Sequence, residues 1–127
     1  EINIMDINEL YTADAHEAGA ECRIVNPADG SDTDCYITVI GIDSKSFRAE
    51  QRKRQRKALD AVRSNKPIPD DEFGLLVESC TGWRGFKNDK KDWPFTKKNL
   101  MALFENSPLI ADQVDKFIAD RENFIKG

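Results

Sequence analysis

The stretch that decides the fold reads Cys80-Thr-Gly-Trp-Arg-Gly-Phe86, then Asp92-Trp-Pro-Phe-Thr-Lys-Lys-Asn-Leu-Met-Ala-Leu-Phe104, then Asn106-Ser-Pro-Leu-Ile110. It contains both tryptophans of the chain and three of its phenylalanines. Large aromatic side chains bury the most apolar area, so we expect the core to form around them. The polar, Lys/Asp-rich segment between Gly82 and Asp92 is typical of a loop.

Two helix starts lie within this stretch. Thr96 is expected to cap the first helix, with Phe95 before the cap and Leu100 at the fourth helical position, which is the spacing of a hydrophobic staple. Ser107 and Pro108 are expected to begin the second helix, as cap residue and first-turn proline. No two residues of the stretch form a nucleophile–base pair or a metal-ligand set, so we interpret it as a helical piece of core.

A third helix is predicted just upstream. Asn-Lys-Pro-Ile-Pro at residues 65–69 breaks the preceding helix, and Asp70 is expected to cap the next one. Asp71 and Glu72 suit the positive end of that helix, and Gly82 is its expected end. Apolar residues at helical spacing define its core-facing side: Phe73, Leu76, Val77 and Cys80.

Two short segments predict a β-hairpin over about residues 20–41. Both segments alternate and are rich in β-forming residues, and Asn26-Pro-Ala-Asp-Gly30 between them favours a turn. The residues expected to share a face are Cys22 and Ile24 on the first strand, and Cys35, Ile37 and Val39 on the second. A lone hairpin is marginally stable in water, so helices must cover it.

A long basic helix is predicted over about residues 44–64, with Asp43 as its cap and with Ile42 and Phe47 as a second staple pair. At about 100° per residue, one face holds Phe47, Gln51, Gln55, Ala58 and Val62. The candidate partner-binding residues fan over the opposite side: Arg52, Lys53, Arg54, Arg56 and Lys57. Because the middle of the first face is polar, this part of the helix is expected to project beyond the core or to meet another subunit.

The charge of the chain is segregated. Residues 44–66 contain nine Lys/Arg and two Asp/Glu, a net charge of +7, whereas the other residues contain ten and 21, a net charge of −11. Such a dipolar chain favours self-association or a charged partner over general nucleic-acid binding. Two interpretations of the basic side stay open: a solvated helix face, or a contact surface for an acidic partner.

Together these elements predict an α+β fold, with one β-hairpin packed against a long basic helix and about three shorter amphipathic helices. The 127 residues are expected to form one domain, with its helical part over about residues 70–126. Residues 1–4 precede Met5, the expected native start, and are interpreted as an added extension. The predicted core residues are Ile37, Val39, Phe47, Phe73, Leu76, Val77, Trp83, Phe95, Leu100, Phe104, Val114, Phe117 and Ile118.

No catalytic, metal-binding or cofactor-binding residues are predicted. The three cysteines are an odd, sparse set that suits a reducing compartment, and a zinc site would need about four close ligands. Cys22 and Cys35 could face each other across the hairpin, although small buried thiols are the favoured interpretation. The single histidine, His16, has no obvious partner. No apolar run approaches the roughly 20 residues of a membrane helix and no secretory signal is evident, so we expect no membrane association.

Two ordered sets of motifs support a family resemblance. The first is Asn26-Pro-Ala-Asp-Gly30, then Ile37-Thr-Val-Ile-Gly-Ile-Asp-Ser-Lys-Ser-Phe-Arg48 running into the basic helix. The second is Gly82-Trp-Arg-Gly-Phe86, then Trp93-Pro-Phe-Thr-Lys-Lys-Asn-Leu-Met-Ala-Leu-Phe104, then Ser107-Pro-Leu-Ile110. In order and spacing, over about 100 residues, they resemble the tail assembly chaperones of long-tailed bacteriophages. The polar loop at residues 87–92 departs from the family pattern.

The resemblance implies a non-enzymatic chaperone that binds the tape-measure protein and promotes polymerisation of the tail-tube protein around it. It also implies a place in the cytoplasm of the infected host cell and absence from the finished virion. The family is made as a short form and often a frameshift-extended form, and a chain ending at Ile125-Lys-Gly fits the short form. Self-association is expected as well.

Three other functions compete with the chaperone as interpretations of the sequence. A permanent structural tail protein of the terminator or completion type would be found in purified virions. A small nucleic-acid-binding module using the basic helix is disfavoured, because the chain is acidic overall and has no aromatic stacking surface near that helix. An enzyme is the least favoured, because the chain has one histidine, no Gly-rich phosphate loop and no acidic pair at a recognisable spacing.

Overall fold

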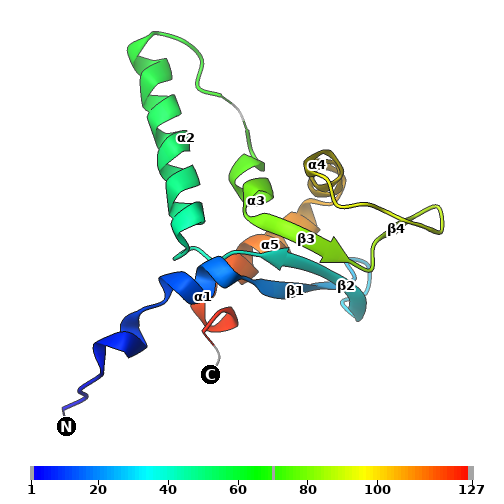
Figure 1. Ribbon diagram of the computed structural model, residues 1–127. Coiled ribbons are helices and arrows are strands. Elements are labelled where there is room, and N and C mark those ends of the chain that lie inside the picture. Colours follow the sequence, from blue (N-terminus) through cyan, green and yellow to red (C-terminus); the bar gives the residue numbers. More distant parts are fainter. Residues whose placement is uncertain (1, 70, 126–127) are drawn as a thin grey trace.

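The computed structural model describes residues 2–69 and 71–125 and has the predicted α+β fold (Figure 1). Its strands are β1 (Ala20–Val25), β2 (Asp32–Val39), β3 (Cys80–Arg84), β4 (Lys87–Asn88) and β5 (Lys91–Asp92). Its helices are α1 (Ala13–Ala18), α2 (Lys45–Arg63), α3 (Gly74–Glu78), α4 (Lys97–Asn106) and α5 (Pro108–Ala119), with 3-10 turns η1 (Ile7–Leu10) and η2 (Arg121–Asn123).

The predicted hairpin is β1–β2, and it belongs to an antiparallel sheet of three strands with β2 in the centre. Side chains alternate between the two faces of a strand, and the buried face of the hairpin holds Cys22, Ile24, Ile37 and Val39. Helix α5 packs on the sheet. The side-chain amide of Gln113 on α5 bonds both the N–H and the C=O of Val25, at 2.8 and 2.9 Å. Burial of one face therefore sets the strand register, because a shift of one residue would expose it.

The third strand corrects the prediction of a helix reaching Gly82. Helix α3 ends at Glu78, and Cys80 begins β3, in which Gly82 pairs with Thr38 of β2. The ammonium group of Lys97 donates to the C=O groups of Val77 and Cys80, at 3.0 and 3.1 Å. The apolar residues thus keep helical spacing even where the secondary structure changes from helix to strand. The change occurs because strand pairing outweighs local periodicity here.

The helix caps follow the prediction at α4 and differ at α2. Thr96 caps α4, and its hydroxyl accepts the N–H of Asn99 at 3.0 Å. Ser44, and not Asp43, caps α2 by accepting the N–H of Phe47 at 3.0 Å. Ser107 occupies the cap position of α5, where Pro108 stands in the first turn, but its side chain makes no capping bond. The predicted cap Asp70 lies outside the described residues.

The core lies between the sheet and α3, α4 and α5. Of the predicted core residues, those that are buried are Ile37, Val39, Val77, Leu100, Phe104, Val114 and Ile118. Those that are half-buried and pack against the core are Phe47, Phe73, Leu76, Trp83, Phe95 and Phe117.

Trp83 organises an aromatic cluster next to this core. Its ring stacks on Trp93 with 5.1 Å between centroids, lies 4.8 Å from Phe86, and meets Phe95 edge-on at 5.3 Å. Its indole N–H donates to the C=O of Trp93 at 2.8 Å, so the polar atom of the half-buried ring is satisfied. The segment predicted as a loop contains the end of β3 and the small β4–β5 hairpin, so it is more ordered than expected.

Helix α2 stands away from the rest of the molecule (Figure 1). Its N-terminal end lies at α1, one side faces α3, and its C-terminal end is remote from the sheet. None of its 19 residues is buried. Of the two expectations for this helix, projection from the core and contact with another subunit, the structure shows the first.

Candidate functional site

The exposed side of α2 is the first candidate site. Four of the five predicted partner-binding residues are exposed and free to meet a partner: Arg52, Lys53, Arg56 and Lys57. Arg63, nearly two turns beyond Lys57, is exposed as well. Like charges gathered on one helix side repel each other, and an acidic partner would relieve that repulsion.

Arg54 does not belong to this exposed set. Its guanidinium lies 2.6 Å from an oxygen of Asp71 and 3.0 Å from an oxygen of Glu50, and only 29% of its side chain is exposed. Its hydrogen bond to Asp71 raises the pKa of Arg54 above the ordinary value. A Cβ at Gly74 would clash with this pair, so the small residue lets α2 and the start of α3 approach. Arg54 therefore connects α2 to the body of the protein.

The face of α2 turned toward the body also differs from the predicted one. Phe47, Gln51 and Ala58 are half-buried as expected, but Gln55 and Val62 are exposed. The residues turned inward in their place are Glu50, Arg54 and Ala61. The polar Glu50–Arg54 pair could not be recognised as inward-facing by hydrophobic periodicity, which counts only apolar residues.

Apolar side chains are exposed beside the basic ones. Leu59 is 48% exposed and Val62 is 61% exposed. At helical spacing, Leu59 neighbours Arg56 at i−3 and Arg63 at i+4, with Arg52 one turn further back. We call these residues, Arg52, Arg56, Leu59, Val62 and Arg63, the outer face of α2. It combines exposed apolar area with positive charge, and a surface with these two properties is suited to bind an acidic, partly apolar groove.

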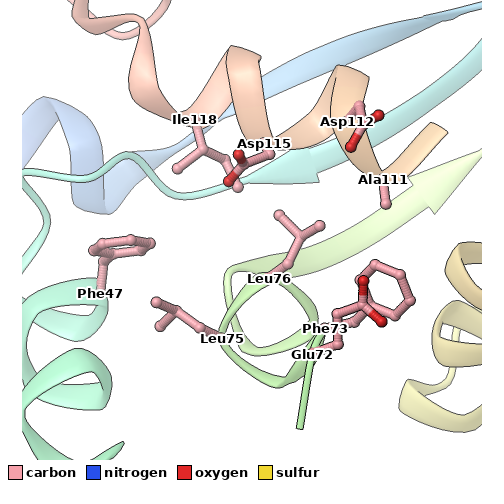
Figure 2. Close-up of a pocket in the computed structure, with 9 residues that line it drawn as sticks. All are labelled: Phe47, Glu72, Phe73, Leu75, Leu76, Ala111, Asp112, Asp115 and Ile118. Carbon is pink, nitrogen blue, oxygen red and sulfur yellow. The ribbon is translucent and has the colours of Figure 1, made fainter. Parts of the chain in front are cut away.

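A second feature, a cleft of about 300 Å³, opens between the first turn of α2, α3 and α5 (Figure 2). Its apolar lining consists of Phe47, Phe73, Leu75, Leu76, Ala111 and Ile118. The other three lining residues are exposed carboxylates, Glu72, Asp112 and Asp115, and no lining residue is basic. We call this feature the acidic cleft. Asp112 and Asp115 lie at i and i+3 on α5 between buried Ala111 and Ile118, a pattern that could have predicted an acidic edge beside the core.

Asp43 anchors the first turn of α2. Its carboxylate accepts hydrogen bonds from Thr12 at 2.6 Å, from Arg121 at 2.8 and 3.0 Å, and from Arg48 at 3.2 Å. The Arg121 guanidinium, with the Thr12 and Arg48 donors, holds the pKa of Asp43 well below its ordinary range. These hydrogen bonds connect residues that are far apart in the sequence. Local sequence patterns therefore predict only a helix cap at Asp43.

His16 lies directly under this anchor. It is fully buried, its Nδ1 accepts the N–H of Asp43 at 3.0 Å, and its ring stacks on Phe124 at 4.6 Å. Burial lowers its pKa, although the nearby Asp43 charge partly opposes that shift. A Cβ at Gly41 would collide with the imidazole, so glycine is needed at that position. His16 is therefore a neutral structural side chain under the start of α2.

Two of the three cysteines, Cys22 and Cys80, are buried. All three are free thiols, and Cys22 lies opposite Ile37 and not Cys35. Burial raises the pKa of Cys22 to about 11 and that of Cys80 to about 12, so both stay protonated at neutral pH. Within residues 2–69 and 71–125, no group of three or more His, Cys, Asp or Glu could hold a metal ion. In the same residues, no helix has both the length and the apolarity to cross a membrane.

Comparison of the chain with protein-family models, with curated proteins and with solved structures finds no significant match in any of the three.

Proposed function

We propose that this protein is a non-enzymatic assembly chaperone of a long-tailed phage, which binds the tape-measure protein through the exposed basic side of α2 and promotes tail-tube polymerisation. The observation that carries the proposal is α2 itself: 19 residues without one buried side chain, projecting from the body and presenting Arg52, Lys53, Arg56 and Lys57. A projecting helix costs stability unless a partner uses it, because its apolar residues gain nothing by burial within its own domain. The motif order described above supplies the partner class.

A long helical protein suits this surface. An acidic helical partner would neutralise the basic side and cover Leu59 and Val62, which are exposed next to it. Phosphate groups of a nucleic acid would satisfy the charge but would leave these apolar side chains in water. The apolar area therefore favours a protein partner over the nucleic-acid alternative.

The test is a pull-down of the purified tape-measure protein with the purified chain. Arg52→Glu/Arg56→Glu/Lys57→Glu should keep its fold and lose binding, because exposed substitutions usually change stability by less than about 0.5 kcal/mol each. The matched control is Lys87→Glu/Lys90→Glu/Lys91→Glu, which makes the same charge change on the exposed β4–β5 hairpin and should still bind. Moderate salt should weaken the wild-type complex, because the contact is between exposed charges.

Two results would contradict the proposal. One is wild-type binding by the α2 variant. The other is a chain that ignores the tape-measure protein but binds DNA with a steep inverse dependence on salt, which is the behaviour of a nucleic-acid-binding module. Detection of the chain in purified virions would instead support the permanent tail protein.

A further inference from the structure

The acidic cleft has the composition of a docking groove. Figure 2 shows Phe47, Leu76 and Ile118, which come from three different helices and point toward one another. Carboxylates of α5 and of the segment just before α3 surround them. None of the three carboxylates has a basic neighbour in the lining. A ligand that fills this groove must bring apolar side chains and positive charge together.

The chain itself carries a surface of that kind. On the outer face of α2, exposed Leu59 lies among Arg52, Arg56 and Arg63, and exposed Val62 flanks Leu59 at i+3, on the side away from the arginines. The two surfaces match in apolarity, with leucine and valine against an apolar floor. They also match in charge, with three arginines against three carboxylates. Charge complementarity of this kind selects partners and orients them.

A chain cannot place its own outer face in its own cleft. Phe47, at the first turn of α2, lines the cleft, and Leu59 lies twelve residues further along the same helix. At a rise of about 1.5 Å per residue, Leu59 is roughly 18 Å away from Phe47 along the helix axis. The two surfaces can therefore meet only between two copies.

We infer that the acidic cleft of one copy receives the outer face of α2 of a second copy. Leu59 and Val62 of one copy then cover the floor at Leu76 and Ile118 of the other. Arg56 and Arg63 pair with the rim carboxylates. Either a reciprocal dimer or a head-to-tail series satisfies this contact, since each chain carries both surfaces. This contact uses the same side of α2 that the proposed function gives to the tape-measure protein, so assembly and tape-measure binding compete for Arg56 and Leu59. Assembly is tested without the tape-measure protein, so that the two proposals can fail separately.

The test is size-exclusion chromatography with light scattering on the purified full chain at low salt. The cleft variant is Asp112→Lys/Asp115→Lys and the helix variant is Arg56→Glu/Arg63→Glu. Each should need at least about tenfold more protein for half-assembly than wild type, which corresponds to about 1.4 kcal/mol. The four substitutions in one chain restore opposite charges across the contact and should restore assembly. The matched control is Asp32→Lys/Asp34→Lys, two exposed carboxylates on β2, which should assemble as wild type does.

An uncharged change keeps the test sharp. Leu59→Ser removes apolar contact area without altering charge, so it should also weaken assembly, while circular dichroism should show the wild-type helix content. A wild-type chain that stays monomeric, a cleft variant that assembles normally, or folded charge-swapped chains that fail to recover assembly would each overturn the inference.

Discussion

The two ends of α2 differ in what holds them. At the first turn, Ser44 caps the helix, Asp43 accepts bonds from three other side chains, and buried His16 lies beneath. Toward the far end, Leu59 and Val62 stay exposed, and beyond the middle of the helix only half-buried Ala58 and Ala61 turn inward. The first turn is thus specified by the body of the protein, whereas the outer face of α2 is exposed.

This difference separates folding from binding along a single helix. Substitutions at the first turn should change the free energy of unfolding, because they break contacts that the folded chain makes. Substitutions on the outer face should change association and leave unfolding nearly unaffected. If substitutions at both places change unfolding and association alike, then folding and binding are not separated along α2.

Removal of a large aromatic side chain from the body of the protein should cause the largest loss in the free energy of unfolding. Trp83→Ala removes an indole that contacts three aromatic rings and bonds the C=O of Trp93. The expected loss is about 3–5 kcal/mol, the range for removing a large aromatic side chain from a core. Urea unfolding followed by circular dichroism measures it. An unchanged midpoint combined with weaker partner binding would instead make Trp83 a contact residue.

Asp43→Ala tests the first turn of α2. It leaves Arg121 and Thr12 without their acceptor, and the expected loss is about 1.5–3 kcal/mol, the range for a hydrogen bond to a charged group. Asp60→Ala is the control, because Asp60 is exposed on the same helix and should cost less than about 0.5 kcal/mol. Equal urea midpoints for the two variants would show that the first turn of α2 is no more important for folding than its far end.

The elements that have local sequence patterns could be predicted from the sequence. The hairpin faces, the Thr96 cap and the long basic helix follow from alternation, cap chemistry and periodicity. Sequence reasoning missed β3, because Cys80 continues a helical apolar spacing while its strand partner lies some forty residues earlier in β2. It also placed Arg54 with the free charges, because the pairing with Asp71 depends on how the chain returns beside α2. The cleft required three helices to be placed together, which no local pattern specifies.

The pH dependence of stability tests the buried imidazole beneath the first turn. The pKa of His16 is lower in the folded protein than the ordinary value, so on acidification below about pH 6.5 the unfolded chain takes up a proton first. Stability should therefore fall as the pH drops from 7 to 5.5. His16 is the only histidine, and carboxylates and thiols ordinarily titrate outside this window. His16→Asn, whose Oδ1 can accept the Asp43 N–H, should lose less stability over the same interval, whatever its stability at pH 7. An equal loss in both proteins would assign the pH effect to another group.

The smallest expected effect on folding comes from the outer face of α2. Arg56 and Arg63 are exposed and lie on the side of α2 away from the Arg54–Asp71 pair. Arg56→Glu/Arg63→Glu should shift the free energy of unfolding by less than about 0.5 kcal/mol per substitution. Arg54→Glu is the matched change on the inward side: it places a third carboxylate beside Glu50 and Asp71, so it should destabilise the protein more than the double variant does. Urea unfolding of the three proteins decides this, at a protein concentration below that of wild-type half-assembly, because association of folded chains would itself raise the apparent stability. If the double variant were the less stable one, the outer face would be part of the fold, and the distinction between the two sides of α2 would be wrong.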